Sequence, residues 1–176
     1  MAKVILTCGL VCAGKTTYAR RLCADMPAAF LSADEIMLAL FGPDAGDKHD
    51  AYFARVRDYL YEKAASLARD GIDTVADLGM WSRKERDRAR RFFKDRGIDM
   101  EIRYLKIGEE EWKRRIRLRS RDIARGFSGA YEVDEGLRKK CLAAFEEPEG
   151  EENVTTLRAE DLPFPAEGFP ASAGTS

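Results

Sequence analysis

Histidine is almost absent from this chain, which has a single one, His49, among its 176 residues. One histidine excludes the HExxH zinc motif and every metal site that needs several histidine ligands. A Ser-His-Asp triad would depend on His49, which lies in a stretch rich in glycine and aspartate with no nucleophile-elbow motif nearby. Zinc-peptidase and serine-hydrolase chemistry are therefore excluded.

Cysteines and long apolar runs are also scarce. The four cysteines have neither the spacing of a disulfide framework nor the CxxC pairs of a zinc site. The longest stretch without a charged residue, Val4 to Gly14, has eleven residues and is too short to cross a bilayer. This stretch also lacks the basic start and the small-residue cleavage site of a signal peptide. We therefore expect a cytoplasmic protein.

Neither sign of charge dominates, since the chain has 30 lysines and arginines and 31 aspartates and glutamates. This balance gives no general attraction to nucleic acid or to an anionic membrane. Residues 81–125, however, hold 17 basic and 9 acidic side chains. The basic middle of the chain predicts attraction to an anionic ligand.

The residues that are present, 45% hydrophobic and 35% charged, suit a folded domain. Apolar runs alternate with amphipathic segments, which predicts strands alternating with helices. The expected strands are 3–7, 28–32, 72–78, 100–107 and 153–157. The expected helices are 15–25, 34–40, 51–70, 83–96, 109–122 and 134–145, with a loop over 41–50. This pattern predicts an α/β fold with a five-stranded parallel sheet and helices on both faces. We place the domain at 1–160 and a flexible tail at 161–176.

The strongest motif is Gly9-Leu-Val-Cys-Ala-Gly-Lys-Thr16, which matches the phosphate-binding loop G-x-x-x-x-G-K-[ST]. Its glycines let consecutive backbone N–H groups point at phosphate oxygens, and the helix that follows adds its positive end. Lys15 is expected to reach the β- and γ-phosphates of ATP, and the Thr16 hydroxyl to ligate Mg²⁺. The predicted nucleotide-binding residues are Gly9, Cys12, Ala13, Gly14, Lys15, Thr16 and Thr17. Cys12 is either a small apolar residue or a redox-sensitive thiol.

Two carboxylates follow expected strands and should meet at the carboxyl edge of the sheet, where ligands of such folds bind. Asp34 is a candidate general base that accepts a proton from an attacking hydroxyl, although Ser32 or Asp34 would also suit a helix N-cap. Asp77 ends its strand as the acid of a Walker B motif does, so we expect it to hold Mg²⁺ with Thr16 or to orient an arginine. Both aspartates are also candidates for contact with the acceptor.

Arginines crowd the segment 112–125, where Arg115 and Arg119 share one face of the expected helix. One of them is expected to close over the transferring phosphoryl group as part of a lid at about 112–134. Trp112 and Ile116 are expected to pack on the sheet. In the preceding helix, Arg86 is predicted to hold a substrate phosphate or to pair with the strand-end acid Asp77.

Together these motifs resemble those of small P-loop kinase-like ATP-binding proteins, a group that includes polynucleotide 5′-kinases, chloramphenicol phosphotransferase, zeta toxins and the AAA_33 proteins. The resemblance covers about residues 3–155 and also includes Asp77-Leu-Gly-Met-Trp81 and Phe145-Glu-Glu-Pro148. It implies an adenylate-kinase-like sheet, ATP as the phosphoryl donor, Asp34 as the general base, and Arg115 and Arg119 at the lid. Polynucleotide kinases of this group usually carry an arginine three residues after the aspartate, where this chain has Met37.

The sequence thus favours an ATP-dependent phosphotransferase that acts on a hydroxyl of a small molecule. The first alternative is a polynucleotide 5′-hydroxyl kinase, which Met37 disfavours together with the lack of aromatic residues interleaved on a basic surface. The second is an ATP-binding switch or toxin-like protein without kinase activity. The nature of the acceptor separates the three hypotheses.

Overall fold

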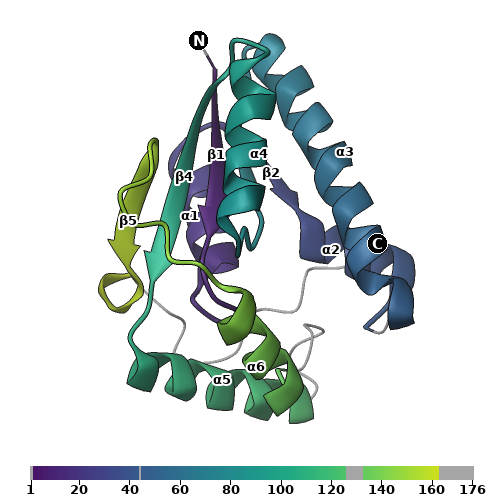
Figure 1. Ribbon diagram of the computed structural model, residues 1–176, viewed down its shortest axis with the longest axis vertical. Helices are drawn as coiled ribbons and strands as arrows, with labels where there is room; N and C mark the ends of the chain where they lie inside the picture. Colours follow the sequence, from purple (N-terminus) through teal and green to yellow (C-terminus); the bar gives the residue numbers. More distant parts are fainter. Residues whose placement is uncertain (1, 44, 126–132, 163–176) are drawn as a thin grey trace.

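Five parallel strands form the sheet at the centre of the molecule (Figure 1). The computed structural model describes residues 2–43, 45–125 and 133–162. The strands stand in the order β2-β3-β1-β4-β5, so the first strand lies in the middle. This arrangement confirms the expected α/β fold with a five-stranded parallel sheet. The strands are β1 (Lys3–Cys8), β2 (Ala28–Ser32), β3 (Asp73–Asp77), β4 (Asp99–Lys106) and β5 (Val154–Arg158).

Six helices are present in the described part of the chain, at the places that the apolar periodicity predicts. They are α1 (Lys15–Asp25), α2 (Ala33–Phe41), α3 (His49–Arg69), α4 (Arg83–Lys94), α5 (Glu109–Ala124) and α6 (Glu135–Ala144). The start of α4 shows the local cause, because Ser82 and Glu85 form the reciprocal hydrogen bonds of a capping box. Two 3₁₀ turns, Gly46–Lys48 and Ala159–Asp161, complete the description.

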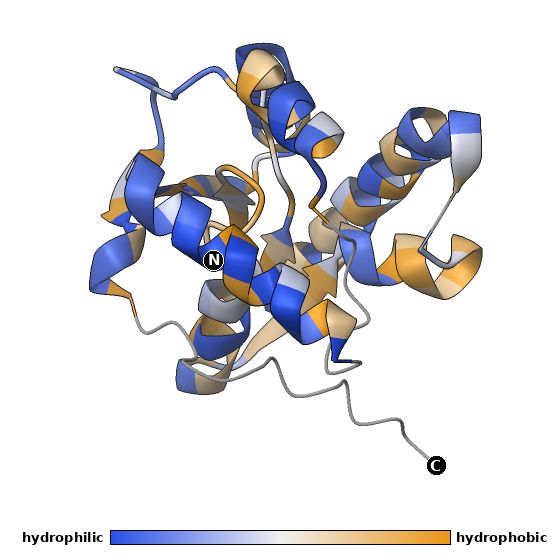
Figure 2. Ribbon diagram, turned by 90° about the horizontal axis from the view of Figure 1, so that it is seen from below, coloured by the Kyte–Doolittle hydropathy of each residue, from blue (hydrophilic) through white to orange (hydrophobic). Residues whose placement is uncertain are grey.

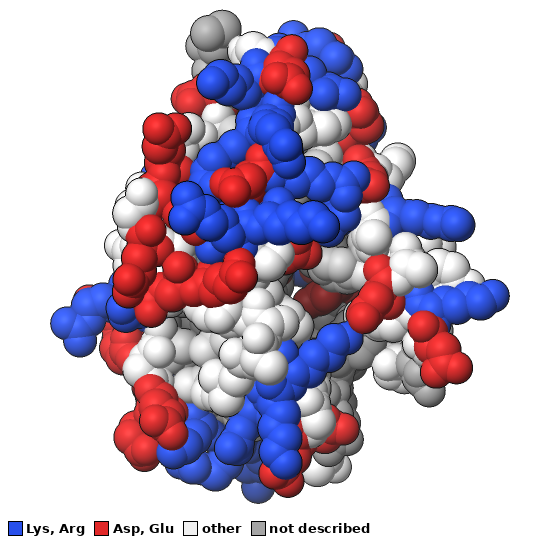
Figure 3. All heavy atoms as spheres, viewed as in Figure 1, with Lys and Arg blue, Asp and Glu red and all other residues white. Residues whose placement is uncertain are grey.

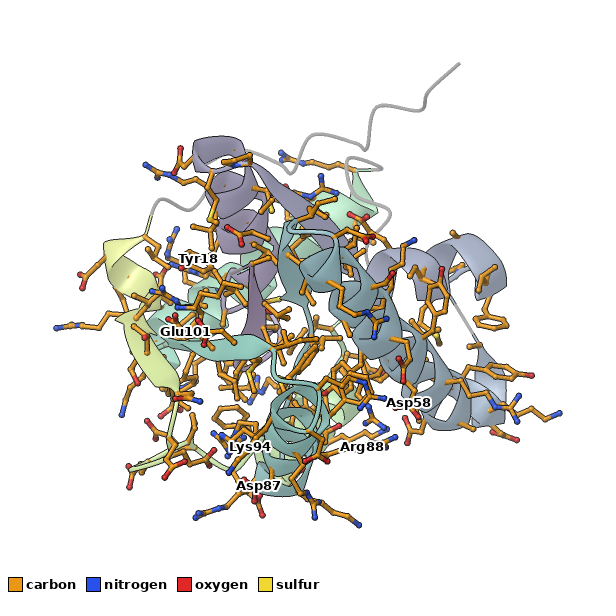
Figure 4. The ribbon with its side chains drawn as sticks, turned by 90° about the horizontal axis from the view of Figure 1, so that it is seen from above. Tyr18, Asp58, Asp87, Arg88, Lys94 and Glu101 are labelled. Carbon is orange, nitrogen blue, oxygen red and sulfur yellow. The ribbon has the colours of Figure 1, made fainter. Side chains whose placement is uncertain are left out.

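Side chains of β1 alternate between two apolar cores, one on each face of the sheet. Val4 and Leu6 belong to the larger core, which α3 and α4 cover, whereas Ile5 packs with Ala19 of α1 on the other face. Figure 4 shows the ion pair that joins the two covering helices, between Arg88 of α4 and Asp58 of α3, at 2.8 Å. The strands are mostly hydrophobic and the outer sides of the helices mostly hydrophilic (Figure 2).

Helices α5 and α6 lie at the carboxyl edge of the sheet, below the strand ends in Figure 1, and α2 follows the end of β2 at the same edge. The surface is hollowed between α6 and the start of α3, and acidic side chains lie at the bottom of this hollow (Figure 3). The hollow is where ligands of open α/β sheets bind.

Three expectations about loops need comment. The loop expected over 41–50 is shorter than predicted, because α2 includes Phe41, a 3₁₀ turn follows, and α3 already begins at His49. Of the lid expected at about 112–134, residues 126–132 lie outside the described residues, as does the tail from 163 onward. The domain boundary at residue 160 stays a prediction. In the described part of the chain, none of the helices is sufficiently long and apolar to cross a bilayer.

Candidate active site

The loop between β1 and α1 has the backbone conformation that its glycines were expected to allow. Gly9 has φ 144° and Gly14 has φ 95°, both in the range that favours glycine. The Gly9 N–H donates to the Gly79 carbonyl at 3.1 Å, and a Cβ on Gly9 would lie 2.9 Å from the Leu105 carbonyl oxygen. The start of the loop is therefore wedged between the ends of β3 and β4, and only glycine fits there.

The pocket beside this loop brings most of the predicted site residues together. It is lined by residues of the loop, of α1, α2 and α5: Val11, Cys12, Gly14, Lys15, Thr16, Thr17, Asp34, Arg115 and Arg119. The Lys15 ammonium donates to the Leu10 carbonyl at 2.8 Å, so the lysine lies over its own loop. A nucleotide phosphate in the pocket would replace this carbonyl as the stronger partner of the ammonium group.

Asp77 meets the loop from the end of β3. The Thr16 hydroxyl donates to Asp77 Oδ2 at 2.5 Å, and the Thr7 hydroxyl of β1 lies 2.8 Å from Asp77 Oδ1. Burial raises the pKa of the Asp77 carboxyl, while Lys15 and the hydrogen bond from Thr16 act in the opposite direction. A hydroxyl and a carboxylate side by side form the all-oxygen donor set that Mg²⁺ prefers, so these residues fit the expected metal.

Asp34 lies on the other side of the pocket, in the first turn of α2. The helix N-cap is Ser32, whose side chain accepts from the Glu35 N–H at 3.3 Å. Asp34 is exposed and is therefore available to a ligand. Ser32 pairs with Asp77 in the register of β2 and β3, so both predicted carboxylates come from neighbouring strand ends.

Two buried polar atoms of the pocket walls have no hydrogen-bond partner among the described residues. They are Arg119 Nε and the Thr17 hydroxyl. Another nitrogen of the Arg119 guanidinium lies 3.7 Å from the Cys12 sulfur. Unsatisfied buried donors cost stability, so their presence around this pocket fits a site that is completed by an anionic ligand.

Arg115 is anchored differently from Arg119. Its buried guanidinium donates to Glu111 at 2.7 Å, to the Ala13 carbonyl at 2.9 Å and to the Ala159 carbonyl at 2.7 Å. It thereby joins the phosphate-binding loop to the segment that follows β5. Arg115 borders the pocket, but three of its contacts hold the protein itself together.

The expectation that Trp112 and Ile116 pack on the sheet is wrong. Both form an apolar cluster with Val133 against the phosphate-binding loop, including Val11 and Cys12. The indole N–H of Trp112 donates to the Val11 carbonyl at 2.6 Å. The physical reason is the position of α5, which passes below the carboxyl edge of the sheet and so faces the loop (Figure 1).

Arg86 is fully buried and does not line the pocket. Its guanidinium donates to Glu151 at 2.7 Å and to the Met80 carbonyl at 3.0 Å, so the acid that it meets is Glu151 and not Asp77. Hydrogen bonds from Arg86 and Arg90 hold the pKa of Glu151 below its usual value, although burial acts against them. Met37 is also fully buried, in the larger core, and its side chain is directed away from solvent.

Sequence reasoning missed the residues that support the pocket from behind. Thr7 was detectable as a polar residue near the end of an apolar strand that precedes the phosphate-binding loop. Trp112 was predicted to be a packing residue, but the sheet was the wrong packing partner. No sequence pattern identifies Glu151 as the partner of Arg86, because 65 positions separate the two residues.

The fold and the pocket together define a P-loop nucleotide-binding protein of the kinase-like type. Residues 4–148 match the family AAA_33, described as an AAA domain, so the chain belongs to this family. Among curated proteins, none matches this chain.

Solved structures with the same fold include several kinases. A putative kinase from Chloroflexus aurantiacus is 17% identical, with a TM-score of 0.71 and coverage of 92% of each chain. A sugar kinase from Janibacter sp. HTCC2649 is 20% identical, with a TM-score of 0.65 and coverage of 92% of this chain and 88% of the other. A chain of the Pnkp1/Rnl/Hen1 RNA repair complex is 16% identical, with a TM-score of 0.64 and coverage of 81% and 43%. At sequence identities this low, the structural similarity shows that this chain shares their fold.

Proposed function

We propose that this protein transfers the γ-phosphate of Mg·ATP to a hydroxyl group of a small molecule. The observation that carries the proposal is the shared pocket of Lys15, Thr16, Asp34 and Arg119. Binding residues for a triphosphate and an exposed carboxylate thus meet at one place. This is the arrangement that phosphoryl transfer between two substrates requires.

On the donor side, the backbone N–H groups of the loop and the Lys15 ammonium hold the β- and γ-phosphates. Thr16 and Asp77 would hold Mg²⁺, which supplies positive charge to the phosphate oxygens when bound. Arg119 reaches the pocket from α5, and its Nε has no partner among the described residues, so we assign it to stabilise the negative charge that develops on the transferring group. Arg115, with its contacts to Ala13 and Ala159, keeps the loop in place for this role.

On the acceptor side, Asp34 takes the proton of the attacking hydroxyl. The acceptor oxygen forms a bond to the γ-phosphorus, the bond from that phosphorus to the β–γ bridging oxygen breaks, and ADP leaves. Because Asp34 is exposed at the pocket, it can meet an acceptor that enters from the hollow at the sheet edge.

A small-molecule acceptor is favoured over a nucleic acid by Met37. The arginine that would hold a nucleic-acid phosphate in the resembling polynucleotide kinases is replaced by a side chain buried in the core. Helix α2, which is described over its whole length, contains no lysine or arginine that could take the place of this arginine. Kinases of sugars are among the proteins that share the fold, which agrees with an alcohol acceptor.

The experiment is transfer of labelled γ-phosphate from Mg·ATP to pooled metabolites and antibiotics, with single-stranded oligonucleotides in a separate reaction. Asp34→Asn should retain binding of an ATP analogue and lose about 10²- to 10⁴-fold of the transfer rate. Lys15→Ala should lose both binding and transfer. The matched control is Glu35→Gln, which changes the neighbouring exposed carboxylate and should leave the rate unchanged.

Full activity of Asp34→Asn would remove the general base from the proposal. Label that appears only on oligonucleotides would establish the polynucleotide kinase instead. Release of free phosphate with every acceptor, at a rate that no acceptor increases, would favour an ATP-binding switch.

A further inference from the structure

The residues directly after Asp77 combine two features that are unfavourable for stability. Met80 is not glycine and yet has φ 50°, in the left-handed region, while its side chain is buried. The Trp81 indole N–H is buried without a hydrogen-bond partner among the described residues. The indole packs closely against Gly79, since a Cβ on that glycine would lie 3.0 Å from this same indole nitrogen. Such features persist where function requires them.

The surrounding structure fixes this loop at each of its carbonyl groups. The Gly79 carbonyl accepts from the Gly9 N–H at 3.1 Å, and the Trp81 carbonyl accepts from the Glu146 N–H at 2.8 Å. The Met80 carbonyl accepts from Arg86 at 3.0 Å. The buried pair of Arg86 and Glu151 therefore serves to hold the loop, and the loop holds Trp81 in one place.

That place is at the carboxyl edge of the sheet, beside the start of the phosphate-binding loop, because the Gly79 carbonyl accepts from the Gly9 N–H. The indole lies against Gly79, and Gly79 follows the end of β3, which stands between β1 with the phosphate-binding loop and β2 with Asp34. Trp81 is half-buried and belongs to none of the three apolar clusters formed by the described residues. A large, half-buried ring that stays outside these cores at the carboxyl edge of the sheet can contact a ligand.

Resting on the proposed phosphotransferase function, we propose that Trp81 is a wall of the acceptor site and that the acceptor is a sugar or a similar polyhydroxylated ring. The face of an indole carries negative partial charge and attracts the C–H groups on the apolar face of such a ring, while the hydroxyls point to the rim. The exposed carboxylate of Asp34 disfavours an acceptor that carries a phosphate group beside it. A stacked sugar would present one hydroxyl to Asp34.

The chain has only two tryptophans, which makes the proposal measurable by fluorescence. Trp112 contacts the phosphate-binding loop, whereas the Trp81 indole lies against Gly79, after the end of β3. In Trp112→Phe the emission comes from Trp81 alone. We expect saturable quenching or a spectral shift of this emission with at least one of D-glucose, D-ribose, N-acetyl-D-glucosamine and kanamycin, in the presence of a non-hydrolysable ATP analogue.

Trp81→Phe is the matched variant, in which only Trp112 emits. Its emission should respond to the ATP analogue and should not respond to the sugar. The difference between the wild type and Trp81→Phe gives the Trp81 signal a second time, without altering the contact of Trp112 with the loop. The measurement needs no turnover and so reports binding separately from transfer.

Kinetics supply the second test with the sugar that gives the signal. Trp81→Leu should raise KM about tenfold and change kcat little, because stacking acts equally in the ground state and the transition state. Trp81→Phe, which keeps a flat ring, should recover most of the affinity. A general loss of packing would instead lower kcat and the melting temperature in both variants.

The outcomes separate this inference from the proposed function. Transfer to an acceptor whose KM is the same in Trp81→Leu overturns the role of Trp81 and leaves the phosphotransferase standing. A Trp81 signal with a sugar that never becomes labelled supports the site and contradicts the transfer. No Trp81 signal with any of the four compounds, or label only on oligonucleotides, overturns the sugar acceptor.

Discussion

At the scale of the residue, Thr7 shows how a single hydroxyl prepares the site. It lies 2.8 Å from Asp77 Oδ1 and accepts from the Leu78 N–H at 3.1 Å. Both partners are buried, so each needs this hydroxyl to replace the water that it loses on folding. Thr7 therefore fixes the direction of the carboxylate that faces Thr16.

Thr7→Val is expected to lower the free energy of unfolding by about 1–3 kcal/mol, because the shape is kept and two buried polar groups lose their partner. It should also weaken the Mg²⁺ dependence of ATP-analogue binding. Urea unfolding and a binding titration measure the two effects. Thr74→Val is the matched control on the adjacent strand, since the buried Thr74 hydroxyl has no partner among the described residues. This control should be neutral or stabilising, and equal losses in both variants would contradict the assignment.

At the scale of the element, helix α4 is attached to the chain beyond α6 by buried ion pairs. Arg86 and Arg90 both donate to Glu151, at 2.7 and 2.6 Å. Side chains of Arg86 and Glu151 are at most 2% exposed. In such surroundings the pair itself adds little stability, but the loss of one partner leaves a buried charge.

Arg86→Met should therefore cost about 3–5 kcal/mol of unfolding free energy. The double variant Arg86→Met with Glu151→Leu should recover much of this loss, because the unpaired charge is removed as well. Arg83→Met, one turn earlier and exposed, should stay within about 0.5 kcal/mol of the wild type. Equal effects of Arg83→Met and Arg86→Met in denaturant titrations would contradict the buried pair.

The same pair has a consequence for acid stability. The folded pKa of Glu151 is lower than its ordinary value of 4.5, so its ionised form stabilises the fold above about pH 4.5. This contribution is lost as the pH falls from 4.5 through the folded pKa. Glu151→Gln should accordingly be less stable than the wild type at pH 7, and the difference should shrink below pH 4.5. A difference that stays constant with pH would show that charge is not involved.

At the scale of the whole molecule, the phosphate-binding loop is where distant parts of the chain meet. Trp112 of α5 binds the Val11 carbonyl, and Arg115 links the Ala13 carbonyl to Ala159 after β5. The loop also contacts β3 through Gly79. A ligand that binds the loop thus acts on contacts of the first strand, the fifth helix and the last strand together.

A Mg·ATP analogue at about 100 times its Kd should raise the unfolding free energy by about 2.7 kcal/mol. Thermal unfolding at several ligand concentrations measures this effect. Lys15→Ala should abolish the shift without changing the melting temperature of the free protein much, since the hydrogen bond of the Lys15 side chain within the described residues is to the Leu10 carbonyl of its own loop. The same shift in Lys15→Ala would place the nucleotide elsewhere.

Sequence patterns predicted the parts of this molecule that depend on local order. Strand ends fall within about one residue of the predicted ones, because apolar runs bounded by glycine and charge mark them. Ser82 with Glu85, and Gly9 with Gly14, are readable as a cap and a turn because each acts on its own neighbours. The partners of Trp112 and Arg86 were not predictable. The amphipathic pattern of a helix indicates that one of its faces is buried, but it does not indicate which residues cover that face.

Met37 carries a consequence in evolutionary terms. Its side chain is completely enclosed in the larger core. An arginine introduced there would bring a charge into surroundings without a partner, which costs several kcal/mol in proteins. A descendant of this gene could not acquire the phosphate-holding arginine of a polynucleotide kinase by one codon change and remain folded. A partner for this charge would have to arise first, so the replacement of Met37 by arginine passes through several substitutions.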